Sequence, residues 1–72
     1  MKTIRFEDKG QDFLEWDLND DNVVIDSRPF QSGVWRRTLV HEVKEGIRPT
    51  ISHPRDGVPR LLNYKIISIR EN

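Results

Sequence analysis

The segment that determines the architecture runs from Thr3 to Leu18 and reads TIRFEDKGQDFLEWDL. Its polar centre, residues 8–11, is flanked on both sides by alternating apolar and polar side chains. A period of two is typical of strands that bury one face, and two such strands around a short polar segment form a hairpin. The segment therefore predicts an antiparallel hairpin.

One register of this hairpin aligns apolar side chains and also forms a charge pair. Its opposed residues are Phe6 with Leu14, Ile4 with Trp16, and Arg5 with Glu15. Cross-strand pairs of these kinds stabilise a sheet, and a slip by one residue would expose the whole apolar face. We expect this register, with Phe6 and Trp16 on the apolar face that packs in the core.

Further strands are predicted along the rest of the chain. The tetrad Asn19-Asp20-Asp21-Asn22 has turn-forming residues, and we expect a second hairpin there with Leu18 against Val23 and Trp16 against Ile25. Together the patterns predict five or six short antiparallel strands, near residues 2–7, 12–18, 22–27, 34–43, 47–52 and 60–70.

The segment 34–43 admits two interpretations. Trp35, Leu39, Val40 and Val43 would form the stripe of a single helix over residues 33–45, ending at Gly46. Several β-branched residues in this segment favour a strand instead, and we adopt the strand. On either interpretation Trp35 is expected in the core, with an exposed binding platform as the alternative.

The last strand, 60–70, has apolar residues on both faces of an extended chain. Such a strand needs cover on both sides, so it should be central, close a barrel or lie at a subunit interface. For this reason, and because the net charge is +0, we also expect self-association as a two-fold homodimer.

Composition supports the all-β class. Val, Ile, Thr and the aromatic residues number 22, whereas Ala, Leu and Met number 6. The first group suits a pleated sheet, and the second includes the best helix formers. We predict a single small all-β domain over residues 1–72, built as an antiparallel meander or a barrel-like curved sheet.

Some properties follow from what the sequence lacks. It has no cysteine, which excludes disulfides and thiolate metal sites and favours a reducing, cytoplasmic compartment. No window is apolar enough to span a membrane. Neither His41 nor His53 has metal-ligand spacing, the four glycines are isolated, and no nucleophile motif is present. We therefore expect no enzyme activity, no cofactor and no metal.

Charge is divided along the chain. Residues 1–26 hold 3 basic and 8 acidic side chains, whereas residues 27–72 hold 9 and 4. A carboxylate pair, Glu15 and Asp17, shares one strand face, but Glu15 already has Arg5 opposite it, which favours ion pairing over acid-base catalysis. The basic part contains arginines near aromatic residues, including Tyr64, as in nucleic-acid-binding sheets.

These observations predict a non-catalytic binding or adaptor module with a protein partner, because the charge is divided and not uniformly basic. The alternative is a small β-barrel that binds nucleic acid. The loop 53–59, with residues 28–33 as its expected neighbour, is where we expect any binding function to reside; the alternative, which the length of the loop favours, is a plain connector between the fifth and sixth strands. The candidate partner-binding residues are Arg28, Phe30, Trp35, Arg36, Arg37, His53, Arg55, Asp56 and Arg60.

Overall fold

The computed structural model describes residues 1–9, 12–29, 34–53 and 63–72. These residues contain six strands: β1 (Lys2–Glu7), β2 (Phe13–Leu18), β3 (Val24–Arg28), β4 (Leu39–Val40), β5 (Ile51–Ser52) and β6 (Lys65–Glu71). The described residues contain no helix. The predicted all-β class is therefore confirmed.

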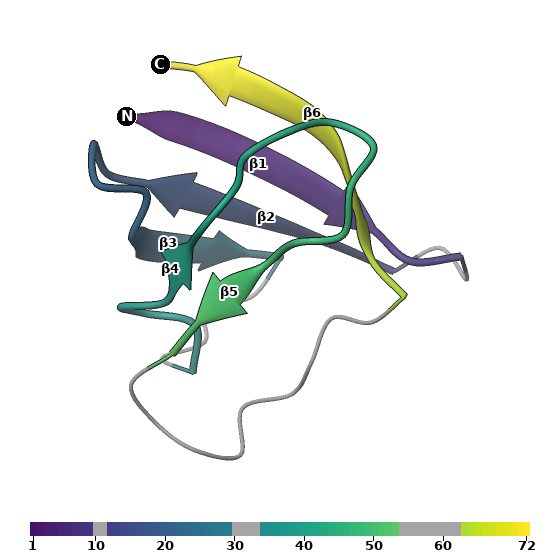
Figure 1. Ribbon diagram of the computed structural model, residues 1–72, viewed down its shortest axis with the longest axis horizontal. Coiled ribbons are helices and arrows are strands. Elements are labelled where there is room, and N and C mark those ends of the chain that lie inside the picture. The colour runs from purple at the N-terminus through teal and green to yellow at the C-terminus, as the bar shows by residue number, and fades with distance from the viewer. Residues whose placement is uncertain (10–11, 30–33, 54–62) are drawn as a thin grey trace.

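The strands form two sheets, both antiparallel. The larger sheet has four strands in the order β3-β2-β1-β6, and β4 and β5 form the smaller one. Figure 1 shows the small sheet in front of the larger, with the chain between β4 and β5 arching towards β6. Strands β1 to β3 make the predicted meander, but the sheet is not closed into a barrel.

The first hairpin has the predicted register. In the pairing of β1 with β2, Phe6 lies opposite Leu14, Ile4 opposite Trp16 and Arg5 opposite Glu15. The alternation then separates the two faces of the sheet, because successive side chains point to opposite sides. One face packs in the core and the other carries charged residues.

The core lies between the larger sheet and the segment that contains β4 and β5. Its buried apolar residues are Ile4, Phe6, Leu14, Trp16, Leu18, Val24, Trp35, Val40 and Ile66. The ring centroid of Trp16 lies 4.6 Å from that of Phe6 and 5.2 Å from that of Trp35. Trp35, which is 7% exposed, is thus a core residue, as expected from the sequence, and not an exposed platform.

The predicted register of the second hairpin was wrong. Leu18 pairs with Val24 and Trp16 with Ser27, because a bulge shifts the register beside Asp17. Asn22 adopts a left-handed conformation (φ 62), which asparagine tolerates, and this lengthens the turn by comparison with the prediction. The shift brings Arg28 opposite Glu15.

The predicted strand over 34–43 was too long. Residues 34–37 form a turn, and only Leu39–Val40 is a strand, β4. The backbone here bonds to the start of β3, with Val24 N–H donating to Thr38 C=O and Arg37 N–H to Val24 C=O. Arg37 has a φ of 73 in this turn. These long-range bonds take the place of the local bonds that a helix would need.

The segment between β4 and β5 joins the far edge of the larger sheet. Gly46 N–H donates to Ile66 C=O, and Ile66 N–H donates to Ile47 C=O. The strand predicted over 47–52 is therefore reduced to β5, and Pro49 before it is buried. Of the strand predicted over 60–70, the described part begins at Lys65.

The position of β6 in the sheet is at an edge. It pairs with β1 on one side and meets only the Gly46 and Ile47 backbone on the other among the described residues. Ile66 is buried, as a strand covered on one face requires, but Ile67 is 45% exposed. Of the three expected positions for the last strand, a central place in the four-stranded sheet is thus wrong.

Candidate binding site

The outer face of the larger sheet carries a network of ion pairs centred on Arg28. Its Nη2 lies 2.8 Å from Asp17 Oδ1, and its Nη1 donates to Asp17 Oδ2 at 2.9 Å. Its Nε lies 3.3 Å from Glu15 Oε1, and Nη1 is 3.8 Å from Asp26 Oδ2. Two parallel bonds from one guanidinium to one carboxylate are the strongest ion-pair geometry in proteins.

This geometry lowers the pKa of Asp17 from 3.8 to about 2. The hydrogen bonds from Arg28 are the largest cause; burial opposes them, and the Thr3 hydroxyl, which donates to Oδ1 at 2.7 Å, adds to the lowering. The positive charge of Arg70 acts in the same direction. Asp17 is therefore ionised at neutral pH and cannot serve as a proton donor there.

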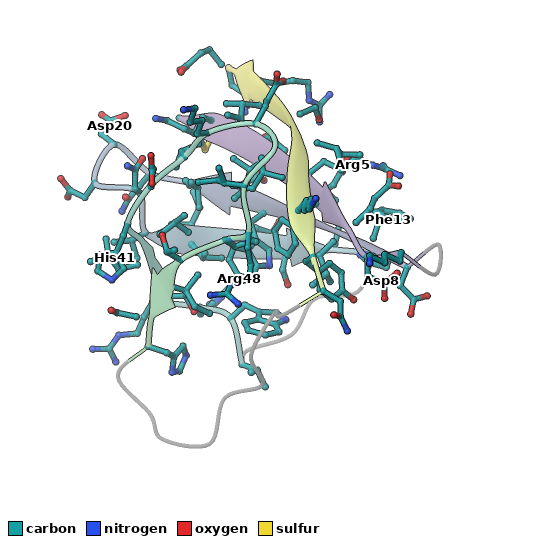
Figure 2. All side chains as sticks on the ribbon, turned by 45° about the vertical axis from the view of Figure 1, so that its right-hand side comes forward. Arg5, Asp8, Phe13, Asp20, His41 and Arg48 are labelled. Atoms are coloured by element: carbon teal, nitrogen blue, oxygen red, sulfur yellow. The ribbon has the colours of Figure 1, made fainter. Side chains whose placement is uncertain are left out.

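Arg5 extends the network along the same face. Its Nη1 lies 3.3 Å from Glu15 Oε2 and its Nε 3.1 Å from Glu7 Oε2. Its guanidinium carbon also lies 4.0 Å from the centre of the Phe13 ring, a cation–π distance, and Figure 2 shows the two side chains together. Glu15 and Asp17 thus bind arginines, as expected from the sequence for Glu15.

The structure places the predicted binding residues in different surroundings. Arg28 is engaged by carboxylates on the outer face, and Trp35 is buried in the core. Arg36 and Arg37 are exposed in the turn 34–37, and His53 is half-buried after β5. The other four candidates, Phe30, Arg55, Asp56 and Arg60, lie outside the described residues. For the same reason the candidate loop 53–59 is described only at His53.

One polar pair on the small sheet was not predicted. The His41 ring Nε2 and the Ser52 hydroxyl are within hydrogen-bond distance, and both residues are exposed. Figure 2 shows His41 on the side of the molecule away from Arg5 and Phe13. Within the described ranges no group of three or more His, Cys, Asp and Glu residues could hold a metal ion.

The outer edge of β6 presents backbone hydrogen-bonding groups. Asn72 N–H donates to Met1 C=O at 2.9 Å, so the amide of residue 72 points towards β1. Amides alternate in direction along an antiparallel strand, so those of Glu71 and Ile69 point away from β1. Neither residue has a backbone partner on that side in the part of the chain that the structure describes. The outward N–H and C=O groups of Ile69 and Glu71, four groups in all, form what we call the β6 edge, and exposed Ile67 lies beside them.

Sequence reasoning missed the β6 edge because strand order cannot be read from local alternation. The only available signal was that the last strand has apolar residues on both faces. Ile67 belongs to this apolar pattern, but its side chain is 45% exposed, so the fold of the single chain does not cover it.

Comparisons with known proteins add no assignment: no family model matches the chain, and neither a curated protein nor a solved structure resembles it significantly. In the described part of the chain, no helix is long and apolar enough to cross a membrane.

Proposed function

We propose that this chain is a non-catalytic binding module for another protein, and that it binds an extended segment of that partner by adding it to the β6 edge. The observation that carries the proposal is the row of outward backbone groups on Ile69 and Glu71, which find no backbone partner among the described residues. Strand addition of this kind obtains affinity from main-chain hydrogen bonds and specificity from neighbouring side chains.

Two further features support a binding role. Ile67 places an apolar side chain on the strand that carries the outward groups, where a bound segment would cover it. The carboxylates of Glu15 and Asp17 form ion pairs with arginines. They therefore stabilise the sheet, which supports the non-catalytic part of the proposal. We place this role in a reducing, cytoplasmic compartment because the chain contains no cysteine.

A proline at position 71 tests the β6 edge. Glu71→Pro removes one outward N–H and no β1–β6 bond, because the Glu71 amide points away from β1. Proline is tolerated at such a position of an edge strand. The probe is a synthetic hairpin peptide closed by an Asn-Gly turn, with Thr-Val-Gln-Val-Thr as its outer strand. We expect NMR titration to show protection of the Ile69 and Glu71 amides in the native chain. We also expect about 2- to 12-fold weaker binding by Glu71→Pro, the effect of one lost hydrogen bond.

Glu71→Ala is the matched control, because it removes the same side chain but keeps the N–H. It should bind the probe like the native chain. Equal binding by the proline and alanine variants, or protection confined to other strands, would count against strand addition at β6.

Nucleic-acid binding is the second candidate, favoured by the turn 34–37. Arg36 and Arg37 are adjacent and exposed there, and neither makes an ion pair within the described residues. Cations in such a position are available for phosphate oxygens.

Fluorescence anisotropy with single- and double-stranded oligonucleotides decides between the two candidates. If phosphates are bound, Arg36→Ala or Arg37→Ala should each weaken binding and reduce the slope of log K against log salt by about 0.7 to 0.9. Under the protein-binding proposal we expect no binding at about 150 mM salt. Submicromolar affinity at that salt concentration would place nucleic acid first.

A further inference from the structure

Arg70 lies between the two residues whose amides form the β6 edge. It pairs with Thr3 of β1, and Thr3 in turn pairs with Asp17 of β2, so the three lie in one row across the sheet. Asp17 is the carboxylate in this row, but its oxygens already accept hydrogen bonds from Arg28 and Thr3. Exposed Arg70 makes no ion pair among the described residues. Its cation is therefore available to an added strand.

The geometry of an added strand brings its central side chain close to Arg70. The outward groups of Ile69 and Glu71 would make the hydrogen bonds, so the position opposite Arg70 is a non-hydrogen-bonded pair. In antiparallel sheets the side chains of such pairs approach more closely than those of hydrogen-bonded pairs. The residue at this position thus contributes most to selectivity by charge.

A second copy of β6 fits this edge poorly. Pairing Ile69 of each copy with Glu71 of the other would satisfy all four outward groups, but it would set Arg70 directly against Arg70. Like charges directly opposite each other destabilise a sheet. Pairing Ile69 of one copy with Ile69 of the other would avoid this opposition. Glu71 of each copy would then lie opposite Ile67 of the other, but the pairing of β6 with β1 shifts its register at Ile67, between Ile66 and Ser68.

Resting on the proposed strand addition, we infer that the natural partner segment carries an Asp or Glu side chain opposite Arg70. A carboxylate there pairs with the Arg70 guanidinium and keeps the hydrogen bonds of the β6 edge. The same arginine disfavours pairing of the chain with itself, which is a common use of charged residues on edge strands.

A charge exchange tests this inference. Two hairpin peptides are compared, identical to the probe above except that the central Gln of the outer strand is Glu in one and Lys in the other. The native chain should bind the Glu peptide about 2- to 25-fold more tightly than the Lys peptide, as expected when an attractive cross-strand pair replaces a repulsive one. Arg70→Glu should reverse the preference. Amide protection at Ile69 and Glu71 reports the binding site in each titration.

The outcomes separate this inference from the proposed function. Equal affinity for both peptides, with Ile69 and Glu71 protected, would leave strand addition standing and remove the carboxylate. Absence of protection with either peptide would remove both proposals. Without peptide, protection of these amides that rises with protein concentration, together with a mass of two chains by light scattering, would show that a second copy occupies the edge. That result would also overturn the inference of an acidic partner.

Discussion

Replacement of Trp16 by alanine should remove about 3 to 5 kcal/mol from the free energy of unfolding. The side chain is 0% exposed and contacts the rings of both Phe6 and Trp35. A chain of 72 residues is expected to have a total stability of about 4 to 11 kcal/mol, so this loss is a large part of it. Urea denaturation followed by circular dichroism measures the change, with the midpoint moving to lower urea.

Two variants control for effects unrelated to the core. Ile25→Thr changes an apolar strand residue that is 41% exposed, and it should alter stability by less than about 0.5 kcal/mol. Trp16→Phe keeps most of the ring volume and removes an indole N–H that has no partner among the described residues. It should therefore cost much less than alanine. A loss below about 1.5 kcal/mol for Trp16→Ala would contradict the central place of this ring.

The second large effect is a loss of stability in acid caused by Asp17. Its pKa is lowered from 3.8 to about 2 by folding, so the folded state favours the ionised carboxylate. The resulting stabilisation, about 2 kcal/mol, is fully present above the unfolded pKa and is lost as the pH falls through the folded one. The difference in unfolding free energy between the native chain and Asp17→Asn should therefore be about 2 kcal/mol at neutral pH. It should shrink towards zero between about pH 4 and pH 2.

Arg28→Gln provides the matched test of the cause. The hydrogen bonds from Arg28 are the main reason for the low pKa of Asp17. In the Arg28→Gln background, Asp17→Asn should therefore lower the free energy of unfolding by less than it does in the native chain. Arg36→Gln removes a charge from an exposed turn residue, and it should leave the acid profile unchanged. A gap between native and Asp17→Asn chains that stays constant from neutral to acid pH would contradict the role of the carboxylate charge.

Much of the first hairpin was predictable because its determinants are local. The residues from Thr3 to Leu18 alternate strictly on both sides of a polar turn, so only one register buries the apolar set. The same register pairs Arg5 with Glu15, and the structure confirms this pair with a 3.3 Å contact. Burial of Trp35 was also predictable, because a small core depends on large aromatic residues.

The second hairpin shows where local reasoning fails. Its register depends on the left-handed turn at Asn22 and on the bulge beside Asp17, and neither has a strong signal in the alternation of apolar residues. Since β3 also bonds to residues 37 and 38, its position is determined partly by a segment distant in the sequence. This register also affects the predicted binding residues, because it places Arg28 opposite Glu15, where Arg28 forms ion pairs with Glu15 and Asp17.

The sequence by itself determined the all-β class and the first hairpin, because alternation, turn residues and β-branched composition act between near neighbours. Tertiary structure alone decided that β6 lies at an edge, that residues 37 and 38 bond to β3, and that Asp17 binds Arg28. The physical reason is that backbone hydrogen bonds between strands are nearly independent of side-chain identity. The choice among strand partners therefore depends on the packing of the whole core, which no single segment specifies.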